Sequence, residues 1–564
     1  MDPDLIIKKI EEYEYVSFDV FDTLLLRPYV KPTDLFRHME INENLPGFSD
    51  ARISAERRAR TKECPEVTLA EIYEGMEPEF SVMMEKELEY EAQVLQPNPE
   101  MKRVFDLALN KGKVVVLLSD MYLPSGFIAD VLSKRGFSGY SKLYVSSDNG
   151  KSKCFGDMFR QVLEDLEISP SELLHIGDDE RSDGKTPSAM GINTARYEKV
   201  IERYFKEHKR EWRFYLKKRE LGRSLIVGVD ALNWISHNKN SNYWHNLGYR
   251  YGGPVLTAFA SFINDNVNDK EGTILFIARD GCGPRRVYNI LYGDVENRYV
   301  YAARIFNVLL GLNGRDYPGY EEQIVDHFSE KGYLPDIIED KKRFFFENGD
   351  LFSKLMSQEL NAYGEYLSGN VKAGTVYVVD ATTQKFSSQR LVKAALGRNA
   401  VGLYYTMLSR TDVCDCRSFV KYRRVPLAYT RVDIPEFLMS SPEPPISGLE
   451  NGNPVFSKDI PEEEKFRLGI MDAVIEGEDN YARHVKTIFG RLIPMLEPNA
   501  AEKWIRSMTA NRTDDDLEHL SRLFWASDPA HNEYHGIVFS PKDAIPFILK
   551  KIDNYYTSLR RRIE

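Results

Sequence analysis

Cysteine is scarce in this chain of 564 residues. The five cysteines are Cys64, Cys154, Cys282, Cys414 and Cys416. Their number is odd and they are scattered, unlike the paired cysteines that form the disulfides of small secreted domains. We therefore expect reduced thiols and a cytoplasmic protein. Cys414 and Cys416 lack a second pair at metal spacing, and His531 and His535 lie between turn-forming residues. We therefore expect no zinc site at either place.

Long apolar runs are missing as well. No stretch of about 18 consecutive apolar residues occurs, so we expect no membrane-spanning helix, although peripheral membrane association stays open. The start Met-Asp-Pro-Asp has neither the basic nor the apolar segment of a signal peptide. A net charge of −11 argues against a broad nucleic-acid-binding surface. The length exceeds what one hydrophobic core organises, so we expect several domains.

The most informative stretch is YVSFDVFDTLLL, residues 15–26. An apolar, β-branched run ends abruptly at Asp19, which predicts a buried strand with a carboxylate at its end. In open α/β sheets, reactive groups collect at the carboxyl ends of strands, where a carboxylate can act as a nucleophile. A strand that merely runs into an acidic turn would look the same, so this stretch alone leaves both interpretations open.

Three later stretches favour the catalytic interpretation. A second apolar run, residues 113–119, ends in Ser119, and Lys153 precedes an amphipathic segment over residues 155–166. A third apolar run ends in a Gly-Asp-Asp loop that contains Asp178, Asp179 and, further on, Asp183. A nucleophilic aspartate followed in this order by a hydroxyl, a lysine and an acidic loop resembles the haloacid dehalogenase (HAD) superfamily.

The resemblance implies a HAD domain over residues 1–200, with a Rossmann-like parallel sheet and a helical cap at about 31–100 that closes over the site. It also implies that Asp19 forms an aspartyl-phosphate. Ser119 and Lys153 would bind the transferring phosphoryl oxygens, with Lys151 as an alternative to Lys153. The implied cofactor is Mg²⁺, with oxygen ligands from Asp19, the carbonyl of Phe21 and Asp178, and with Asp179 or Asp183 completing the outer shell.

One position departs from the pattern of HAD phosphatases. These enzymes usually carry an aspartate two residues after the nucleophile, which protonates the leaving alcohol; here that residue is Phe21, and Asp22 follows it. Loss of acid catalysis typically costs about 10² to 10⁴ in rate. Either Asp22 or a cap residue supplies the proton, or the leaving group is unusually good, or the domain is slow.

A second α/β pattern is expected over residues 225–440, after a charged helical connector at 201–224. A strand ending at Ala278 leads into Arg279-Asp280-Gly281, with Arg285 and Arg286 close behind. Exposed amides, a helix start and arginines suit an anion, although an ordinary turn with solvated arginines is an equal alternative. A later strand ends at Asp380, and a hydroxyl-rich loop follows it.

These two loops resemble divergent motifs of type I phosphoribosyltransferases, in which one loop binds pyrophosphate and the other binds the ribose 5-phosphate. The sequence departs from that pattern at Asp280, at Ala381 and over residues 385–388. The resemblance implies that Asp380 meets the ribose hydroxyls and that the other substrate contacts come from Arg279, Asp280, Gly281, Arg304, Thr382, Thr383, Lys385, Ser387 and Ser388.

The whole chain resembles HAD-containing proteins of bacterial capsule and O-antigen clusters. This resemblance implies a bifunctional enzyme that transfers ribose 5-phosphate from phosphoribosyl pyrophosphate (PRPP) to a glycan acceptor, lipid-linked or free, and then removes the phosphate. Two alternatives remain: a HAD phosphatase whose second domain only binds substrate or a partner, and a non-enzymatic scaffold with a decayed HAD site. Residues 441–564 predict a mainly helical C-terminal region without a chemical signal.

Overall fold

The computed structural model describes most of the chain as two compact units. The described residues are 2–61, 66–236, 242–302, 306, 320–383, 386–407, 415–420, 433–450, 452–457, 460–494, 496, 498–510, 512–526 and 534–536. The first unit comprises residues 1–240 and 484–496, and the second comprises residues 241–483 and 497–564.

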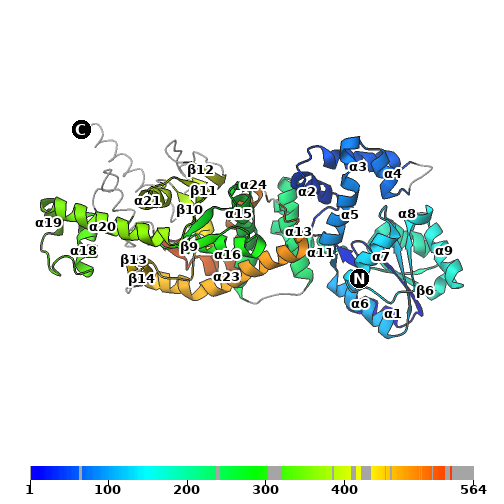
Figure 1. Cartoon of the computed structure of the whole chain (residues 1–564). Helices are drawn as coiled ribbons and strands as arrows, with labels where there is room; N and C mark the ends of the chain where they lie inside the picture. Colours follow the sequence, from blue (N-terminus) through cyan, green and yellow to red (C-terminus); the bar gives the residue numbers. More distant parts are fainter. Residues whose placement is uncertain are drawn as a thin grey trace. The chain divides into compact units, whose positions relative to one another are not determined.

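The first unit is built on a five-stranded parallel sheet with the strand order β5-β4-β1-β6-β7 (Figure 1). Its central strand β1, Tyr15–Asp19, lies between β4, Val114–Ser119, and β6, Leu173–Gly177. These strands are apolar along nearly their whole length because helices cover both faces of the sheet, as is typical of parallel sheets. The arrangement brings three strand ends to the same edge.

The remaining elements of this sheet domain alternate with its strands. They are α1 Pro3–Ile10, α6 Pro99–Asn110, α7 Ser125–Lys134, β5 Lys142–Val145, α8 Ser146–Asn149, α9 Asp157–Leu166, η2 Pro170–Glu172, η3 Glu180–Lys185, α10 Thr186–Ala189 and β7 Asn193–Arg196. Helix α6 begins where sequence rules expect it, since Asn98 accepts a hydrogen bond from the amide of Glu100 and proline occupies the first turn.

A helical segment leaves the sheet after β1 and returns before α6. It departs and returns through two short antiparallel strands, β2 Leu25–Leu26 and β3 Gln96–Pro97. Between them lie α2 Asp34–Asn42, α3 Phe48–Ala59, α4 Leu69–Glu74, η1 Pro78–Phe80 and α5 Met83–Val94, grouped beside the sheet domain in Figure 1. The fully buried Arg52 of α3 holds Glu87 of α5 through two hydrogen bonds of 2.8 Å. This bidentate pair fixes the two helices against each other.

Further segments complete the first unit. Three helices follow the sheet, α11 Val200–Glu207, α12 Lys209–Lys217 and α13 Leu221–Ile235. The amide of Val30 donates a 2.7 Å hydrogen bond to Ser224 Oγ, which ties α13 to the loop that enters the helical segment. Residues 484–496 pack on the same segment, where His38 Nε2 lies 2.9 Å from the carbonyl oxygen of Leu492.

The second unit contains another five-stranded parallel sheet, with the order β12-β11-β10-β8-β9. Its strands are β8 Thr273–Ile277, β9 Asn297–Val300, β10 Val376–Thr383, β11 Ala400–Met407 and β12 Cys416–Val420. Because β8 and β10 are neighbours, the loops that follow them meet at one edge of the sheet.

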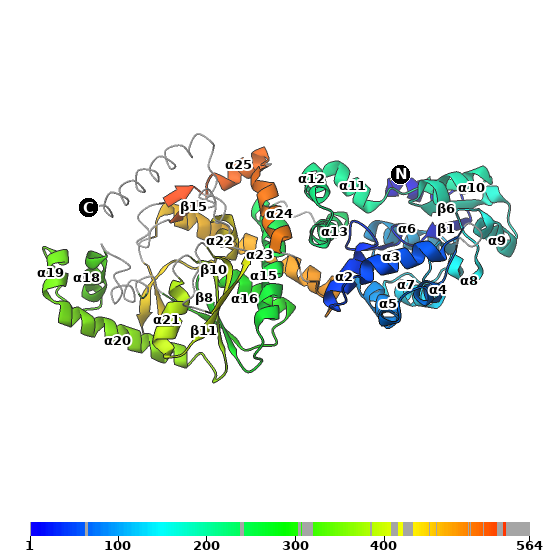
Figure 2. The same cartoon turned by 90° about the horizontal axis from the view of Figure 1, so that it is seen from above.

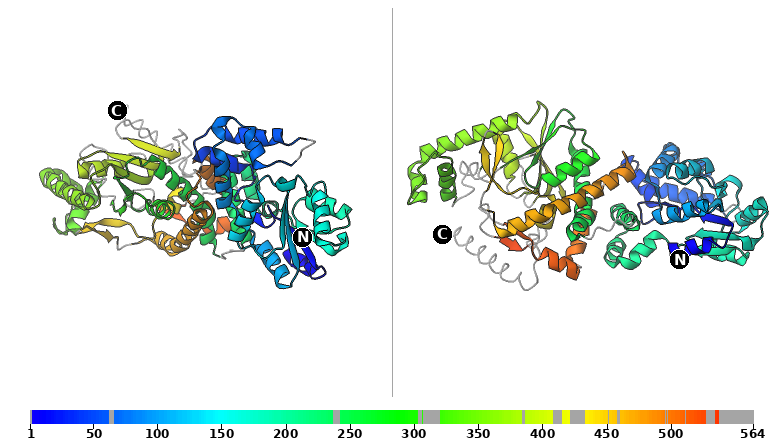
Figure 3. Two further views of the ribbon diagram at one scale, coloured as in Figure 1. Left: turned by 45° about the vertical axis from the view of Figure 1, so that its right-hand side comes forward. Right: turned by 90° about the horizontal axis from the view of Figure 1, so that it is seen from below.

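Helices and two small hairpins surround this second sheet. The elements are α14 Tyr243–Leu247, η4 Gly248–Gly252, α15 Gly253–Asn266, α16 Cys282–Leu291, α18 Glu321–Glu330, α19 Lys341–Glu347, α20 Gly349–Ser368, α21 Ser387–Leu396, α22 Asp433–Met439, β13 Ile446–Glu450, β14 Asn453–Phe456, α23 Glu462–Phe489, α24 Pro498–Ala510, α25 Asp514–Leu520, β15 Phe524–Ala526 and β16 Tyr534–Gly536. Helices α18 and α19 lie at the end of α20 that is remote from the sheet (Figure 2). The 28-residue α23 runs as one uninterrupted helix (Figure 3).

The structure confirms the predicted fold class of parallel α/β sheets accompanied by helical regions. Among the described residues, no helix has both the length and the apolar character needed to span a bilayer. The predicted boundaries at residues 200, 224 and 440 stay predictions. The contacts within the chain place α13, which lies beyond residue 200, in the first unit.

Candidate functional site

The candidate site lies at the carboxyl edge of the first sheet. Asp19 ends β1 opposite Leu118 of β4, one residue before Ser119, the last residue of β4. Asp178 follows the end of β6 directly. All three of these polar side chains are buried, with 6% or less of their surface exposed. The parallel register thus gathers at one point the residues that three separate sequence motifs had singled out.

Lys153 is the cation at the centre of this group. Its ammonium contacts Asp19 Oδ1 at 2.5 Å and Asp183 Oδ1 at 2.6 Å, although only 2% of the residue is exposed. Asp120, the residue after Ser119, fixes the backbone at this point by accepting hydrogen bonds from the amides of Lys153 and Cys154. Of the two alternatives from the sequence, Lys153 is therefore the lysine that reaches Asp19, whereas the amide of Lys151 bonds to Asn149 in an exposed turn.

Asp19, Asp178 and Asp183 could hold a metal ion. Each offers a carboxylate oxygen, and these oxygens lie within 4.8 Å of one another. Asp19 Oδ2 is buried and has no hydrogen-bond partner among the described residues, so one ligand atom is still available. Burial raises the pKa of Asp19 well above its usual value, and burial likewise raises the pKa of Asp178 to about 6. A hard divalent cation with oxygen ligands would satisfy these crowded carboxylates, so the residues fit Mg²⁺.

The loop after β6 is shaped to bring Asp183 back to the strand end. Gly177 permits this approach, because a Cβ atom at this position would lie 2.4 Å from Asp183 Cγ. Asp183 Oδ2 accepts a hydrogen bond from the amide of Asp179, and its other oxygen lies 3.1 Å from His175 Nε2. Burial alone would raise the pKa of Asp183, but Lys153 and His175 beside it hold that pKa well below its usual value.

Asp179, the other predicted outer-shell residue, is turned toward its own loop. Its carboxylate accepts hydrogen bonds from the amides of Arg181 and Ser182 at the start of η3. The described structure therefore brings Asp183, rather than Asp179, into the carboxylate cluster, while the ligand role predicted for the Phe21 carbonyl stays a prediction.

The turn after the nucleophile strand contains the unusual Phe21 and Asp22. Asp22 adopts a left-handed backbone conformation with φ of 61°, and its carboxylate lies 3.4 Å from Lys199 Nζ. The guanidinium of Arg27 lies 4.7 Å above the ring of Phe21 and is held by the buried Glu91. The position where HAD phosphatases carry an acid is thus occupied by an aromatic ring beneath a cation.

Lys199 is a site residue that sequence reasoning missed. Its ammonium lies 3.1 Å from Asp178 Oδ2 as well as beside Asp22. Burial alone would lower the pKa of Lys199, but the carboxylates of Asp22 and Asp178 raise it above its usual value. Nothing in the sequence marks this lysine, which precedes α11 in a stretch rich in charged residues. His175 was also missed, but a lone histidine within the apolar run of β6 could have signalled a polar partner such as Asp183.

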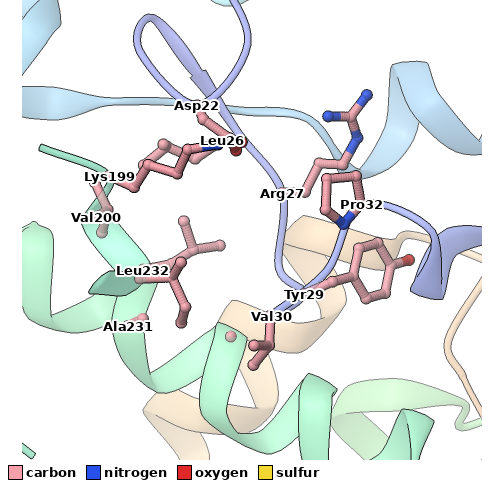
Figure 4. Close-up of a pocket in the computed structure, with 12 residues that line it drawn as sticks. Asp22, Leu26, Arg27, Tyr29, Val30, Pro32, Lys199, Val200, Ala231 and Leu232 are labelled. Carbon is pink, nitrogen blue, oxygen red and sulfur yellow. Dashed lines mark hydrogen bonds and ion pairs between the residues drawn. The ribbon is translucent and has the colours of Figure 1, made fainter. Parts of the chain in front are cut away.

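A pocket of about 580 Å³, counting the part open to solvent, lies next to this turn (Figure 4). Asp22 and Lys199 lie at one end of it, and the apolar side chains of Val30, Val200 and Leu232 line its walls.

A second group of predicted residues lies at the carboxyl edge of the other sheet. Asp380 on β10 accepts hydrogen bonds from Ser388 Oγ at 2.5 Å and from the amide of Ala381 at 2.9 Å. Burial, together with the neighbouring carboxylate of Asp280, raises the pKa of Asp380 to about 7. Gly281 is required at the other loop, because a Cβ there would lie 2.6 Å from the amide nitrogen of Ile277.

The remaining predicted residues of this second group differ in what the structure shows of them. Thr383 Oγ1 accepts a hydrogen bond from the amide of Phe386, which turns the loop into α21, while the buried Thr382 Oγ1 has no partner among the described residues. Ser387 is the first residue of α21. Arg304 and Lys385 lie outside the described residues.

The arginines of the β8 loop contact protein groups. Arg279 forms an ion pair with Glu464 of α23, and Arg286 contacts Glu478 and Asp479 of the same helix. Arg285 donates a 3.0 Å hydrogen bond to Asn297 Oδ1. The sequence had suggested phosphate contacts for this cluster; in the described structure each arginine has a partner within the second unit.

Asparagine at position 380 is expected to change stability with a defined pH dependence. Because the folded-state pKa of Asp380 is raised, the ionised carboxyl destabilises the fold progressively as pH rises from about 4 to about 7. The Asp380→Asn variant should match the wild type at pH 4 and exceed it by about 1–3 kcal/mol at pH 8. Thermal denaturation at both values checks this, with the exposed Asp294→Asn as control. A variant that is less stable than the wild type at pH 8 would contradict the expectation.

The comparisons with known proteins concern the N-terminal third. No family model matches the sequence, and the search of curated proteins finds no match. A haloacid dehalogenase from Xanthobacter autotrophicus aligns at 16% identity over 34% of this chain and 82% of its own, with a TM-score of 0.26. A predicted phosphoglycolate phosphatase from Haemophilus somnus aligns at 11% identity over 33% and 85%, with a TM-score of 0.25. Magnesium-bound YfnB from Bacillus subtilis, which carries a HAD-hydrolase designation, aligns at 21% identity over 33% and 88%, with a TM-score of 0.26.

Proposed function

We propose that the first unit is an Mg²⁺-dependent phosphohydrolase with Asp19 as its nucleophile. The observation that supports this most strongly is the contact of one buried ammonium, that of Lys153, with both Asp19 and Asp183 at the carboxyl edge of the sheet. Such a cation can bind phosphoryl oxygens and offset their charge while the carboxylate attacks. Asp178 lies in the same cluster and completes the group of three carboxylates.

Each residue has a distinct task in this reaction. Asp19 attacks phosphorus as the bond between phosphorus and the ester oxygen breaks, which forms an aspartyl-phosphate and releases the alcohol oxygen with a proton taken from Asp22 or from water. Lys153 binds the phosphoryl group, and Ser119 donates to one of its oxygens. Asp19 and Asp178, with Asp183 behind them, would hold Mg²⁺, which would stabilise the negative charge of the phosphoryl group. Thr23 keeps Asp178 in place through a 3.1 Å hydrogen bond. Water then attacks the phosphorus of the aspartyl-phosphate, the bond from phosphorus to the Asp19 oxygen breaks, and inorganic phosphate leaves while the carboxylate is restored.

Phosphate release from a panel of small phosphomonoesters tests this function. Wild-type protein should release phosphate in the presence of Mg²⁺ and should stop when the cation is chelated. The Asp165→Asn variant is a suitable control, since Asp165 is an exposed partner of Lys142 far along α9. Phosphate release that is indifferent to chelation would remove the metal from the proposal, and no release from any ester would favour the scaffold alternative.

We also propose that the second unit transfers ribose 5-phosphate from PRPP to a glycan acceptor, which the first unit then dephosphorylates to leave a ribofuranose in a bacterial surface polysaccharide. One observation favours it: Asp280 and Asp380, from the loops of neighbouring strands, are close enough for the first to raise the pKa of the second. The two carboxylates offer acceptors for sugar hydroxyls, and Ser388 Oγ, which donates its proton to Asp380, can accept from another.

Calorimetric titration with PRPP and Mg²⁺ tests the second activity. Wild-type protein should bind, and Asp380→Asn should lose the binding while Asp294→Asn keeps it. No binding by the wild type would leave a phosphatase whose second unit has another role, the alternative in which that unit only binds substrate or a partner.

A further inference from the structure

We propose that the pocket beside Asp22 and Lys199 binds the leaving group of the phosphomonoester, and that it admits one compact, pentose-sized body with an apolar face. This inference rests on the phosphohydrolase function proposed above. It assigns substrate selection to helix α13 and to Lys199, which lie outside the four sequence motifs and outside the predicted helical cap.

The pocket is connected to the reacting groups through Lys199. The ammonium of Lys199 lies 3.1 Å from Asp178, a member of the carboxylate cluster, and 3.4 Å from Asp22, which lines the pocket. A substrate whose phosphoryl group lies at Asp19 can therefore extend its organic part past this lysine into the pocket.

The position of α13 against the entry loop, which sets the shape of the pocket, is fixed by close packing and a hydrogen bond. Gly228 of α13 packs directly on the loop that enters the helical segment, and a Cβ at this position would lie 2.3 Å from the carbonyl oxygen of Pro28. The hydrogen bond from the amide of Val30 to Ser224 Oγ fastens the same helix to the same loop. Because α13 is held at two points, the distance between the two walls of the pocket is fixed.

The lining restricts the chemistry of the occupant. Arg27 is already held by Glu91, and the Tyr29 hydroxyl lies 2.7 Å from His38 Nδ1. Asp22 and Lys199 at the inner end therefore offer the principal polar contacts. The walls contributed by α11, α13 and the entry loop are apolar: Leu26, Val30, Pro32, Val200, Ile201, Ala231 and Leu232.

Such a lining suits a body with hydroxyl groups at one end and a hydrocarbon face along its side. A furanose ring has this character, since its hydroxyls can meet Asp22 and Lys199 while its C–H face packs on Leu232 and Val200. The pocket is partly open to solvent, so a second sugar or a base attached to the first ring would project outward. The subsite would then recognise only the terminal unit of a longer substrate.

A variant that fills the pocket tests the inference. In Ala231→Phe, the KM for ribose 5-phosphate should rise by roughly tenfold or more. The kinetic constants for phosphoglycolate, whose leaving group is only two carbons long, should stay within about twofold. Asn233→Phe adds the same ring two residues further along α13, at a position that does not line the pocket, and should leave both substrates unaffected.

A variant that enlarges the pocket keeps the inference testable if Ala231→Phe does not fold. Leu232→Ala should shift the ratio of kcat/KM values toward a hexose 6-phosphate over phosphoglycolate by roughly tenfold. An active wild type whose two variants change both substrates equally, or neither, would overturn the subsite and leave the phosphohydrolase standing. A wild type that hydrolyses no phosphomonoester would overturn the proposed function and the subsite with it.

Discussion

Replacing Asp19 with asparagine is expected to reduce phosphate release by roughly 10⁴-fold or more, to the level of the background reaction. The amide has nearly the same shape as the carboxylate but cannot attack phosphorus, and it cannot form the covalent intermediate. Phosphate release measured at saturating Mg²⁺ on the best ester of the panel checks this expectation.

The matched controls separate chemistry from folding. Asp19→Asn removes one of three carboxylates that lie within 4.8 Å of one another, and Lys153 keeps its contact with Asp183, so the fold should be at least as stable as in the wild type. Asp165→Asn should retain full activity. Activity that survives in Asp19→Asn with normal thermal stability would remove Asp19 as the nucleophile and turn attention to a directly attacking water.

The elements that carry this site were readable from the sequence because the sheet is parallel. Strands β1, β4 and β6 are buried on both faces, so each appears as an apolar run that stops at a polar residue, and those polar residues must share an edge. The choice between Lys153 and Lys151 stayed open in the sequence, and the contact of the Lys153 ammonium with Asp19 decides it. The helical segment between β2 and β3 was expected from the resemblance, and the structure shows a capping box at Thr68 and Glu71 at the start of its helix α4.

Other parts of the site depend on packing between distant segments and leave no local pattern. Lys199 meets Asp22 although the two residues are 177 positions apart in the sequence. The walls of the pocket come from the entry loop and α13, which only the folded chain brings together. The arginines after β8 show the converse case, in which a local pattern is present but suggests the wrong kind of partner. Their sequence context suggests an anion, yet the carboxylates that hold Arg279 and Arg286 lie on α23, almost 200 residues further along the chain.

Replacing Lys153 with methionine is expected to lower the free energy of unfolding of the first unit by about 3–5 kcal/mol when no divalent cation is present. Methionine has a similar length but no charge, so Asp19 and Asp183 would face each other in a buried site without their shared cation. Activity should also fall by roughly 10² to 10³-fold, since the developing phosphoryl charge loses a fixed positive partner. Thermal denaturation of the full chain and phosphate release check the two effects.

The pH dependence and the response to Mg²⁺ distinguish this electrostatic loss from a simple packing defect. In the wild type, Lys153 and His175 keep Asp183 ionised, so its contribution to stability is present above about pH 4 and is lost as pH falls further. Without the ammonium, the carboxylates would bind protons more readily, so the variant should lose stability as pH rises from 5 to 8. Mg²⁺ should raise the melting temperature of the variant more than that of the wild type, because the cation replaces the missing charge.

Lys142→Met removes an exposed ion pair with Asp165 and should show neither effect. If Lys153→Met melts at the same temperature as the wild type at every pH, with or without Mg²⁺, then Lys153 does not neutralise the carboxylates in solution. The phosphoryl-binding role assigned to it then loses its physical basis.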